Sequence, residues 1–233
     1  LGAVTAIYRL PTIVSTSHFL LSIIFLCVLL ILHHGLVSFS NSLKSLKEKW
    51  SLKVTDKLSV SLFFILSSSC LGAFVRHSDI MGSCGLGLES ALLCHDQLWP
   101  ESAQSQVHMF YRYYSFLTWL IAAYSLFGLF RECKRVKVLD FRVIIVASAF
   151  ALSLAQILGL VTVATYLSPV WSVVHFIFNL LTIILFWILY LKVSALERLQ
   201  WGERNYSLSR DLLSLAKPRL AMLVMLTALV GII

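Results

Sequence analysis

The chain has 233 residues, of which 59% are apolar or aromatic and only 13% are charged. A typical soluble domain carries about 25% charged residues, so a water-soluble globule is excluded. The 19 Lys and Arg outnumber the 11 Asp and Glu, and in a membrane protein such a surplus sets orientation rather than indicating nucleic acid. We therefore expect an all-α, polytopic membrane helical bundle with no nucleic-acid partner.

Apolar runs bounded by polar clusters predict the membrane spans. Five runs are long enough to cross a hydrocarbon core about 30 Å thick. They lie near residues 12–33, 58–75, 105–130, 142–166 and 170–191. A partial run at about 1–8 and another that starts near 218 are shorter. We therefore expect the chain to be cut within a span at both ends.

The basic residues sort to one side of these spans. Sixteen of the 19 Lys and Arg lie in or beside the connections 34–57, 131–142 and 192–217, which we expect to be cytoplasmic, in a bacterial inner membrane. The other three, Arg9, Arg76 and Arg112, fall on the outer side. They either hold an anionic ligand there or reach the phosphates of membrane lipid.

The sequence repeats itself at an offset of 157 or 158 residues. Three motifs recur: Leu-Gly-x-Val-Thr at 1–5 and 158–162, Tyr-x-x-Pro at 8–11 and 166–169, and His-Phe at 18–19 and 175–176. Each copy predicts a helix, a short outer turn and a second helix that carries a His. The chain therefore holds one whole repeat and the tail of an earlier one.

The two repeated His residues are the strongest candidates for chemistry. His18 and His175 are expected at equal depth, about two turns below the outer surface. Imidazole ligates haem iron from within helical bundles, so two symmetric His residues suggest two equivalent haem or metal sites. His33 and His34 lie at the cytoplasmic end of their span, where an interfacial role is more typical.

Two cysteines, Cys84 and Cys94, share the outer loop of about 30 residues. The outer compartment is oxidising, so a disulfide between them is plausible. A Cys/His metal site with His77 or His95 is the alternative, although two Cys separated by nine residues match no recognised zinc spacing.

Four segments of the chain resemble a known family when taken together in order and spacing. They are Gly72–His77 at a helix exit, Val107–Arg112 opening the next helix, Ala155–Gly159, and Val174–Phe176. Together they resemble the C-terminal four-helix half of haem A synthase, and residues 1–40 look like the end of its N-terminal half. Residues 41–200 would then be the C-terminal, haem-binding half of a pseudo-symmetric eight-helix protein.

The resemblance implies an oxidoreductase of haem A biosynthesis. The family oxidises the methyl group of haem O to the formyl group of haem A by successive hydroxylations. Electrons pass through a bound haem b and come from a donor that the sequence does not identify. His18 matches the half where the substrate haem O is thought to bind, and His175 matches the cofactor half. The outer pair Cys84–Cys94 matches the family's disulfide loop.

One departure from the family concerns the second iron ligand of the cofactor half. Where the family has His-Arg, this chain has Tyr111-Arg112. The ligand is then either Tyr111 or His108, which lies three residues earlier on the same helix face, or the site has a single His or is degraded. Arg76 and Arg112 would face the haem propionates, because guanidinium pairs bidentately with carboxylate.

A second resemblance concerns residues 201–233. Leu-Ala-Lys-Pro-Arg-Leu at 215–220 is similar to the opening of protoheme IX farnesyltransferase, so we expect a linker and the first helix of that prenyltransferase, fused in cis. The other His and the catalytic carboxylate of the N-terminal half would lie upstream of residue 1, so the fragment alone should be inactive. The alternative function is a non-catalytic haem-binding or electron-transfer membrane module.

Overall fold

The computed structural model describes residues 12–36, 54–87, 89–91, 93–136 and 139–200. Arg9, the partial span at 1–8, the run from 218 and the prenyltransferase-like segment 201–233 lie outside the described residues. So do the side chains of His33 and His34. The predictions made for them are not tested by the structure.

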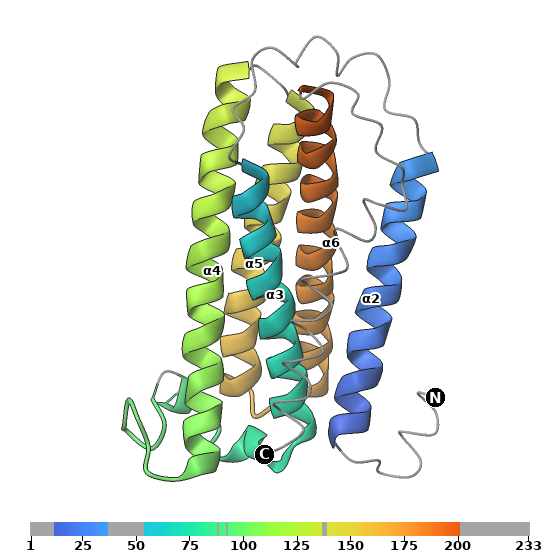
Figure 1. The fold of residues 1–233 in the computed structure, drawn as a ribbon. Helices are drawn as coiled ribbons and strands as arrows, with labels where there is room; N and C mark the ends of the chain where they lie inside the picture. Colours follow the sequence, from blue (N-terminus) through green and yellow to red (C-terminus); the bar gives the residue numbers. More distant parts are fainter. Residues whose placement is uncertain (1–11, 37–53, 88, 92, 137–138, 201–233) are drawn as a thin grey trace. The chain divides into compact units, whose positions relative to one another are not determined.

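The described part of the chain is helical, with an isolated bridge between Cys94 and Gln97 and no strand. Five long helices follow one another in Figure 1: α2 (Thr12–Leu36), α3 (Val54–His77), α4 (Ala103–Val136), α5 (Leu139–Ala164) and α6 (Pro169–Gln200). The short 3-10 turns η2 (Asp79–Gly82) and η3 (Glu89–Ala91) lie between α3 and α4. All five predicted spans are confirmed as helices long and apolar enough to cross a membrane.

The helix ends follow from local sequence. Ser102 caps α4, because its Oγ accepts a hydrogen bond from the backbone N–H of Ser105 at 3.2 Å. Pro169 occupies the first position of α6, where its missing N–H costs nothing. The helix between α4 and α6, α5, ends in a turn in which the backbone of Tyr166 and Leu167 is in the left-handed region, with φ of 56° and 61°. This turn ends α5 two residues before the predicted end of its span.

Consecutive helices from α2 to α5 pack side by side, most extensively α3 with α4. Small polar side chains join that pair. The Ser61 and Ser125 hydroxyls are 2.7 Å apart, and Ser67 Oγ lies 2.6 Å from the hydroxyl of Tyr114. Small residues allow close backbone approach, and buried hydroxyl pairs remove unsatisfied polar groups from the bilayer.

The contacts at the two helix ends agree with spans that alternate in direction. At one end, the Lys192 ammonium lies over the Phe141 ring, 5.7 Å from its centroid, and Arg142 Nη2 donates to the carbonyl of Cys133 at 3.4 Å. At the other end, the Thr12 hydroxyl donates to the carbonyl of His77 at 2.8 Å. The start of α2 therefore meets the end of α3, as the alternation of spans requires.

Candidate functional site

His175 lies on α6, two turns from its start, and is half-buried. Its Nδ1 lies 2.8 Å from the carbonyl oxygen of Ala155 on α5, and its Nε2 lies 2.9 Å from the Asn179 amide nitrogen. A carbonyl oxygen can only accept a hydrogen bond, so Nδ1 carries the proton. Nε2 then keeps its lone pair. The Asn179 amide nitrogen also lies 3.5 Å from Nδ1, so it lies over the face of the ring and not on the axis of that lone pair.

A glycine on α5 makes room for this imidazole. A Cβ added at Gly159 would lie 3.2 Å from His175 Cε1, which is tighter than an ordinary van der Waals contact. The ring therefore lies against the bare backbone of α5. Gly159 sits four residues after Ala155, so the carbonyl and the glycine that receive the ring are on one face of α5.

The same arrangement occurs between α3 and α4. A Cβ added at Gly72 would lie 2.8 Å from the Tyr111 hydroxyl, so the phenol of Tyr111 occupies the space that this glycine leaves. Tyr111 thus lies against α3, whereas His175 lies against α5.

His108 precedes Tyr111 by one turn on α4 and is only 5% exposed. Its Nδ1 is buried and has no hydrogen-bond partner within the described part of the chain. A buried polar atom without a partner is uncommon and marks a place where an unseen group can bind. Both candidates for the second ligand therefore lie on α4, where His108 is buried and Tyr111 half-buried, and His108 has an unsatisfied ring nitrogen.

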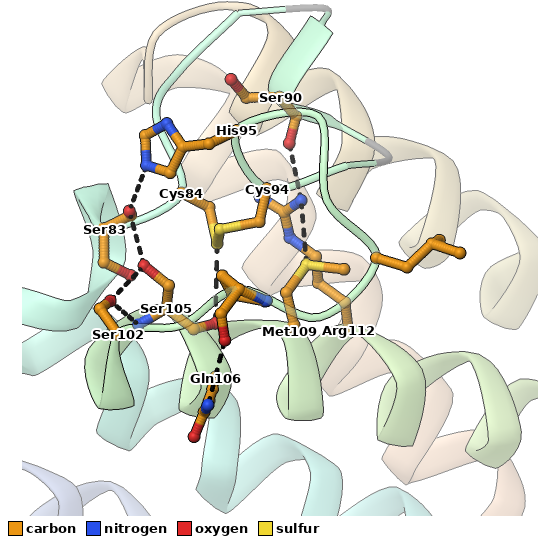
Figure 2. Close-up of a disulfide and its surroundings, with 12 residues drawn as sticks. Ser83, Cys84, Ser90, Cys94, His95, Ser102, Ser105, Gln106, Met109 and Arg112 are labelled. Carbon is orange, nitrogen blue, oxygen red and sulfur yellow. Dashed lines mark hydrogen bonds between the residues drawn. A yellow bond between two sulfur atoms is a disulfide. The ribbon is translucent and has the colours of Figure 1, made fainter.

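The outer loop lies over the start of α4 and contains the Cys84–Cys94 disulfide (Figure 2). Both sulfur atoms are buried beside Met109. Arg112 Nη1 donates to the carbonyl of Ser90 at 2.6 Å. The guanidinium that the sequence predicts to pair with a haem propionate therefore holds the loop. The loop is also attached to α5, because the N–H of Gly87 donates to the carbonyl of Val163 at 3.1 Å.

The remaining candidates, Arg76 and His18, lie on α3 and α2. Arg76 is exposed in the last turn of α3. His18 is half-buried on α2. The next residue, Phe19, contacts Phe176 with ring centroids 5.9 Å apart, so α2 and α6 meet at the level of the two repeated His residues.

Comparison with known families decides the assignment. The family model COX15-CtaA, described as cytochrome oxidase assembly protein, matches residues 1–189. The chain belongs to this family. The predicted kinship with haem A synthase is thereby confirmed at the level of the family. No curated protein and no solved structure matches the chain.

In this member of the COX15-CtaA family, two residues beside His175 were not predicted from the sequence as parts of the site. They are Asn179 and Gly159. Asn179 was overlooked, although it lies four residues after His175 and therefore on the same face of α6. A polar amide in an otherwise apolar span is costly and by itself signals a role. Gly159 was noted as part of a motif, but its role as the surface that receives the ring appears only in three dimensions.

Proposed function

We propose that the protein acts as a haem A synthase, which oxidises the methyl group of haem O to the formyl group of haem A. The observation that carries this proposal is membership of the COX15-CtaA family over residues 1–189. The environment of His175 supports it, because a half-buried imidazole with a free Nε2 lone pair suits ligation of haem iron.

The side chains fit a haem b in this half of the protein. His175 supplies one imidazole, and His108 is our choice for the second, because its buried Nδ1 lacks a partner among the described residues. Tyr111 is the alternative, but its hydroxyl already packs against Gly72. A haem b, when bound, accepts and passes on single electrons.

The protein's own residues would bind and orient this group. His175 and His108 lie near the starts of α6 and α4, the ends that we expect on the outer side, so the propionates of a haem held there would lie near the outer surface. There Arg76 and Arg112 offer guanidinium groups, the side chains best suited to pair with carboxylates. His18 would serve the equivalent site of the other half, where we place the substrate haem O.

The test of this cofactor assignment is the optical spectrum of the purified full-length protein in detergent. We expect a Soret band with the sharp α band of a b-type haem, and its loss in His175→Ala. His108→Ala should change the spectrum to that of a haem with one protein ligand, whereas Tyr111→Phe should leave it unchanged. Absence of any Soret band in the wild-type protein would overturn the proposal.

A second candidate function is a haem-binding, electron-carrying membrane module without catalysis. Tyr111 favours it, because it replaces a His that the resembled family uses as a ligand. The two functions differ in one product. Full-length protein supplied with haem O, reductant and oxygen forms haem A if it is the synthase, and only changes its haem redox state if it is the module.

We also propose that residues 215–233 open a protoheme IX farnesyltransferase fused in cis, in a bacterial inner membrane. The support is the Leu-Ala-Lys-Pro-Arg-Leu motif at 215–220. Full-length protein should then convert protohaem and farnesyl diphosphate to haem O. No haem O from this incubation would contradict the fusion, whatever the outcome for haem A.

A further inference from the structure

The outer loop exposes two large apolar side chains shortly before α4. Leu98 is 67% exposed and Trp99 is 55% exposed. The backbone on either side of them is fixed. Before them, Cys94 and Gln97 exchange two backbone hydrogen bonds of 3.0 Å, and after them Pro100 is buried. The pair is therefore held in one place and is not the tip of a free loop.

A hydrogen bond joins this segment to α4. The Tyr113 hydroxyl donates to the carbonyl of Leu98 at 2.6 Å. Tyr113 is itself exposed, and with Phe110 and Leu117 it forms an exposed apolar face along α4, at spacings of three and four residues. On a helix long and apolar enough to cross a membrane, such a face fits lipid. Leu98 and Trp99 therefore extend the lipid-facing side of α4.

Charged residues near the ends of α3 indicate where the membrane core lies. Lys57 and Arg76 are exposed there, and at about 1.5 Å per residue they lie about 28 Å apart along the helix axis. This separation is close to the thickness of a hydrocarbon core. Charged side chains are costly within that core and stay at its edges, so Arg76 marks the boundary on the side of the outer loop.

The same level on α4 follows from the contacts between the two helices, which run in opposite directions. Ser61 Oγ lies 2.7 Å from Ser125 Oγ, and the Thr118 hydroxyl donates to the carbonyl of Phe64 at 3.5 Å. Counted from these contacts along both helices, the boundary on α4 lies at about residues 106–110. The first turn of α4 therefore lies outside the hydrocarbon core.

Leu98 and Trp99 lie at this boundary. A side chain on a helix leans toward the N-terminus, so the Tyr113 hydroxyl and the Leu98 carbonyl that it binds lie about one turn before Tyr113. Lipid cannot satisfy a backbone carbonyl at this depth, and the Tyr113 hydroxyl does so. Tryptophan is enriched at this depth, because its ring is apolar and its N–H is polar.

We propose that Leu98 and Trp99 anchor the outer loop in the membrane, with both side chains inserted beside α4 among the acyl chains next to the lipid headgroups. The partner is the lipid of the leaflet on the side of the outer loop. The disulfide loop then lies on the membrane surface over the start of α4. This anchor does not depend on the proposed function.

The test uses the full-length protein in phosphatidylcholine vesicles whose acyl chains carry bromine, which quenches tryptophan fluorescence on contact. The chain has six Trp, so the emission of Trp99 is the difference between wild type and Trp99→Phe. Bromine close to the headgroups should quench this emission by about twofold or more, because the indole lies at the boundary. Bromine at the chain ends should quench it less, and acrylamide dissolved in the water should quench it only weakly.

Glu101→Trp in the Trp99→Phe background is the matched control. Glu101 is exposed and charged and lies two residues further along the loop, so a Trp there should be quenched more by acrylamide than by bromine. If acrylamide quenches Trp99 and bromine does not, the segment lies in water and the inference is wrong. If neither quenches Trp99, a protein surface such as a second copy of the chain covers it, and the inference is also wrong.

Discussion

The aromatic rings of Phe19 and Phe176 meet with their centroids 5.9 Å apart, although 157 residues separate them in the chain. They are equivalent residues of the internal repeat, and each directly follows a repeated His. In a two-fold arrangement, a residue that touches its own equivalent lies at the axis. We interpret this contact as the position of the two-fold axis that relates the two repeats. His18 and His175 would then lie on either side of the axis.

The Phe19–Phe176 contact should be measurable as a coupling energy. Phe19→Ala and Phe176→Ala each remove one ring, and the double variant removes both. Aromatic pairs contribute about 0.5–1.5 kcal/mol beyond the area that they bury. A double-mutant cycle of unfolding in detergent should show this coupling, and simple additivity of the two single changes would contradict the contact.

Gly159 and Gly128 make a matched pair of helical glycines. Gly159→Ala places a Cβ 3.2 Å from the His175 ring, which the hydrogen bond to the Ala155 carbonyl holds in place, so we expect about 1–3 kcal/mol of destabilisation. Gly128→Ala meets no described atom within 4 Å and should stabilise α4 by up to about 1 kcal/mol. Melting temperatures of the two variants should shift in opposite directions. Equal shifts would show that the His175 ring does not lie against Gly159.

The Cys84–Cys94 disulfide should stabilise the outer loop. Cys84→Ser with Cys94→Ser opens a loop that spans a sequence separation of 10 and should cost about 2–3 kcal/mol. Reductant should lower the melting temperature of the wild type and leave that of the double variant unchanged. Cys70→Ala, at a free and half-buried cysteine of α3, is the control and should keep its response to reductant.

Arg112 should control the order of the same loop. Arg112→Leu removes the charged donor to the Ser90 carbonyl, which contributes about 1.5–3 kcal/mol locally. Backbone amides at 84–94 should then exchange with deuterium about tenfold to a hundredfold faster. Arg76→Leu is the control, because Arg76 is exposed at the end of α3, and loop exchange should stay at the wild-type rate.

The same two variants test the predicted propionate contacts. If Arg76 and Arg112 pair with propionates, each variant should retain less haem on dilution than wild type does. Unchanged haem retention in Arg112→Leu would show that Arg112 holds the outer loop and does not pair with a propionate.

The arrangement of spans could be predicted from the sequence, because it depends on length and polarity. Apolar runs of about 20 residues have few alternatives in a bilayer, and all five described helices lie where they were expected. The helix ends were less predictable. The last turn of α5 stops at Ala164 because Tyr166 and Leu167 adopt left-handed conformations, which hydropathy does not encode.

The surroundings of the candidate ligands could not be predicted in this way. His175 was predicted from the repeat, but its partner on α5 is the backbone carbonyl of Ala155. Every residue type has a backbone carbonyl, so the sequence does not indicate this contact. Tyr111 was recognised as a departure from the family, whereas its position against Gly72 depends on how α3 and α4 cross. Arg112 was expected to face a propionate, and its hydrogen bond to Ser90 follows from the folded loop.

The most direct test of the central claim is the conversion of haem O by membranes that contain the full-length protein, with haem products separated by chromatography. We predict that wild-type membranes form haem A and that His175→Ala membranes form none at equal protein levels. Unchanged haem O with the wild-type protein, or haem A formed equally by His175→Ala, would contradict the account.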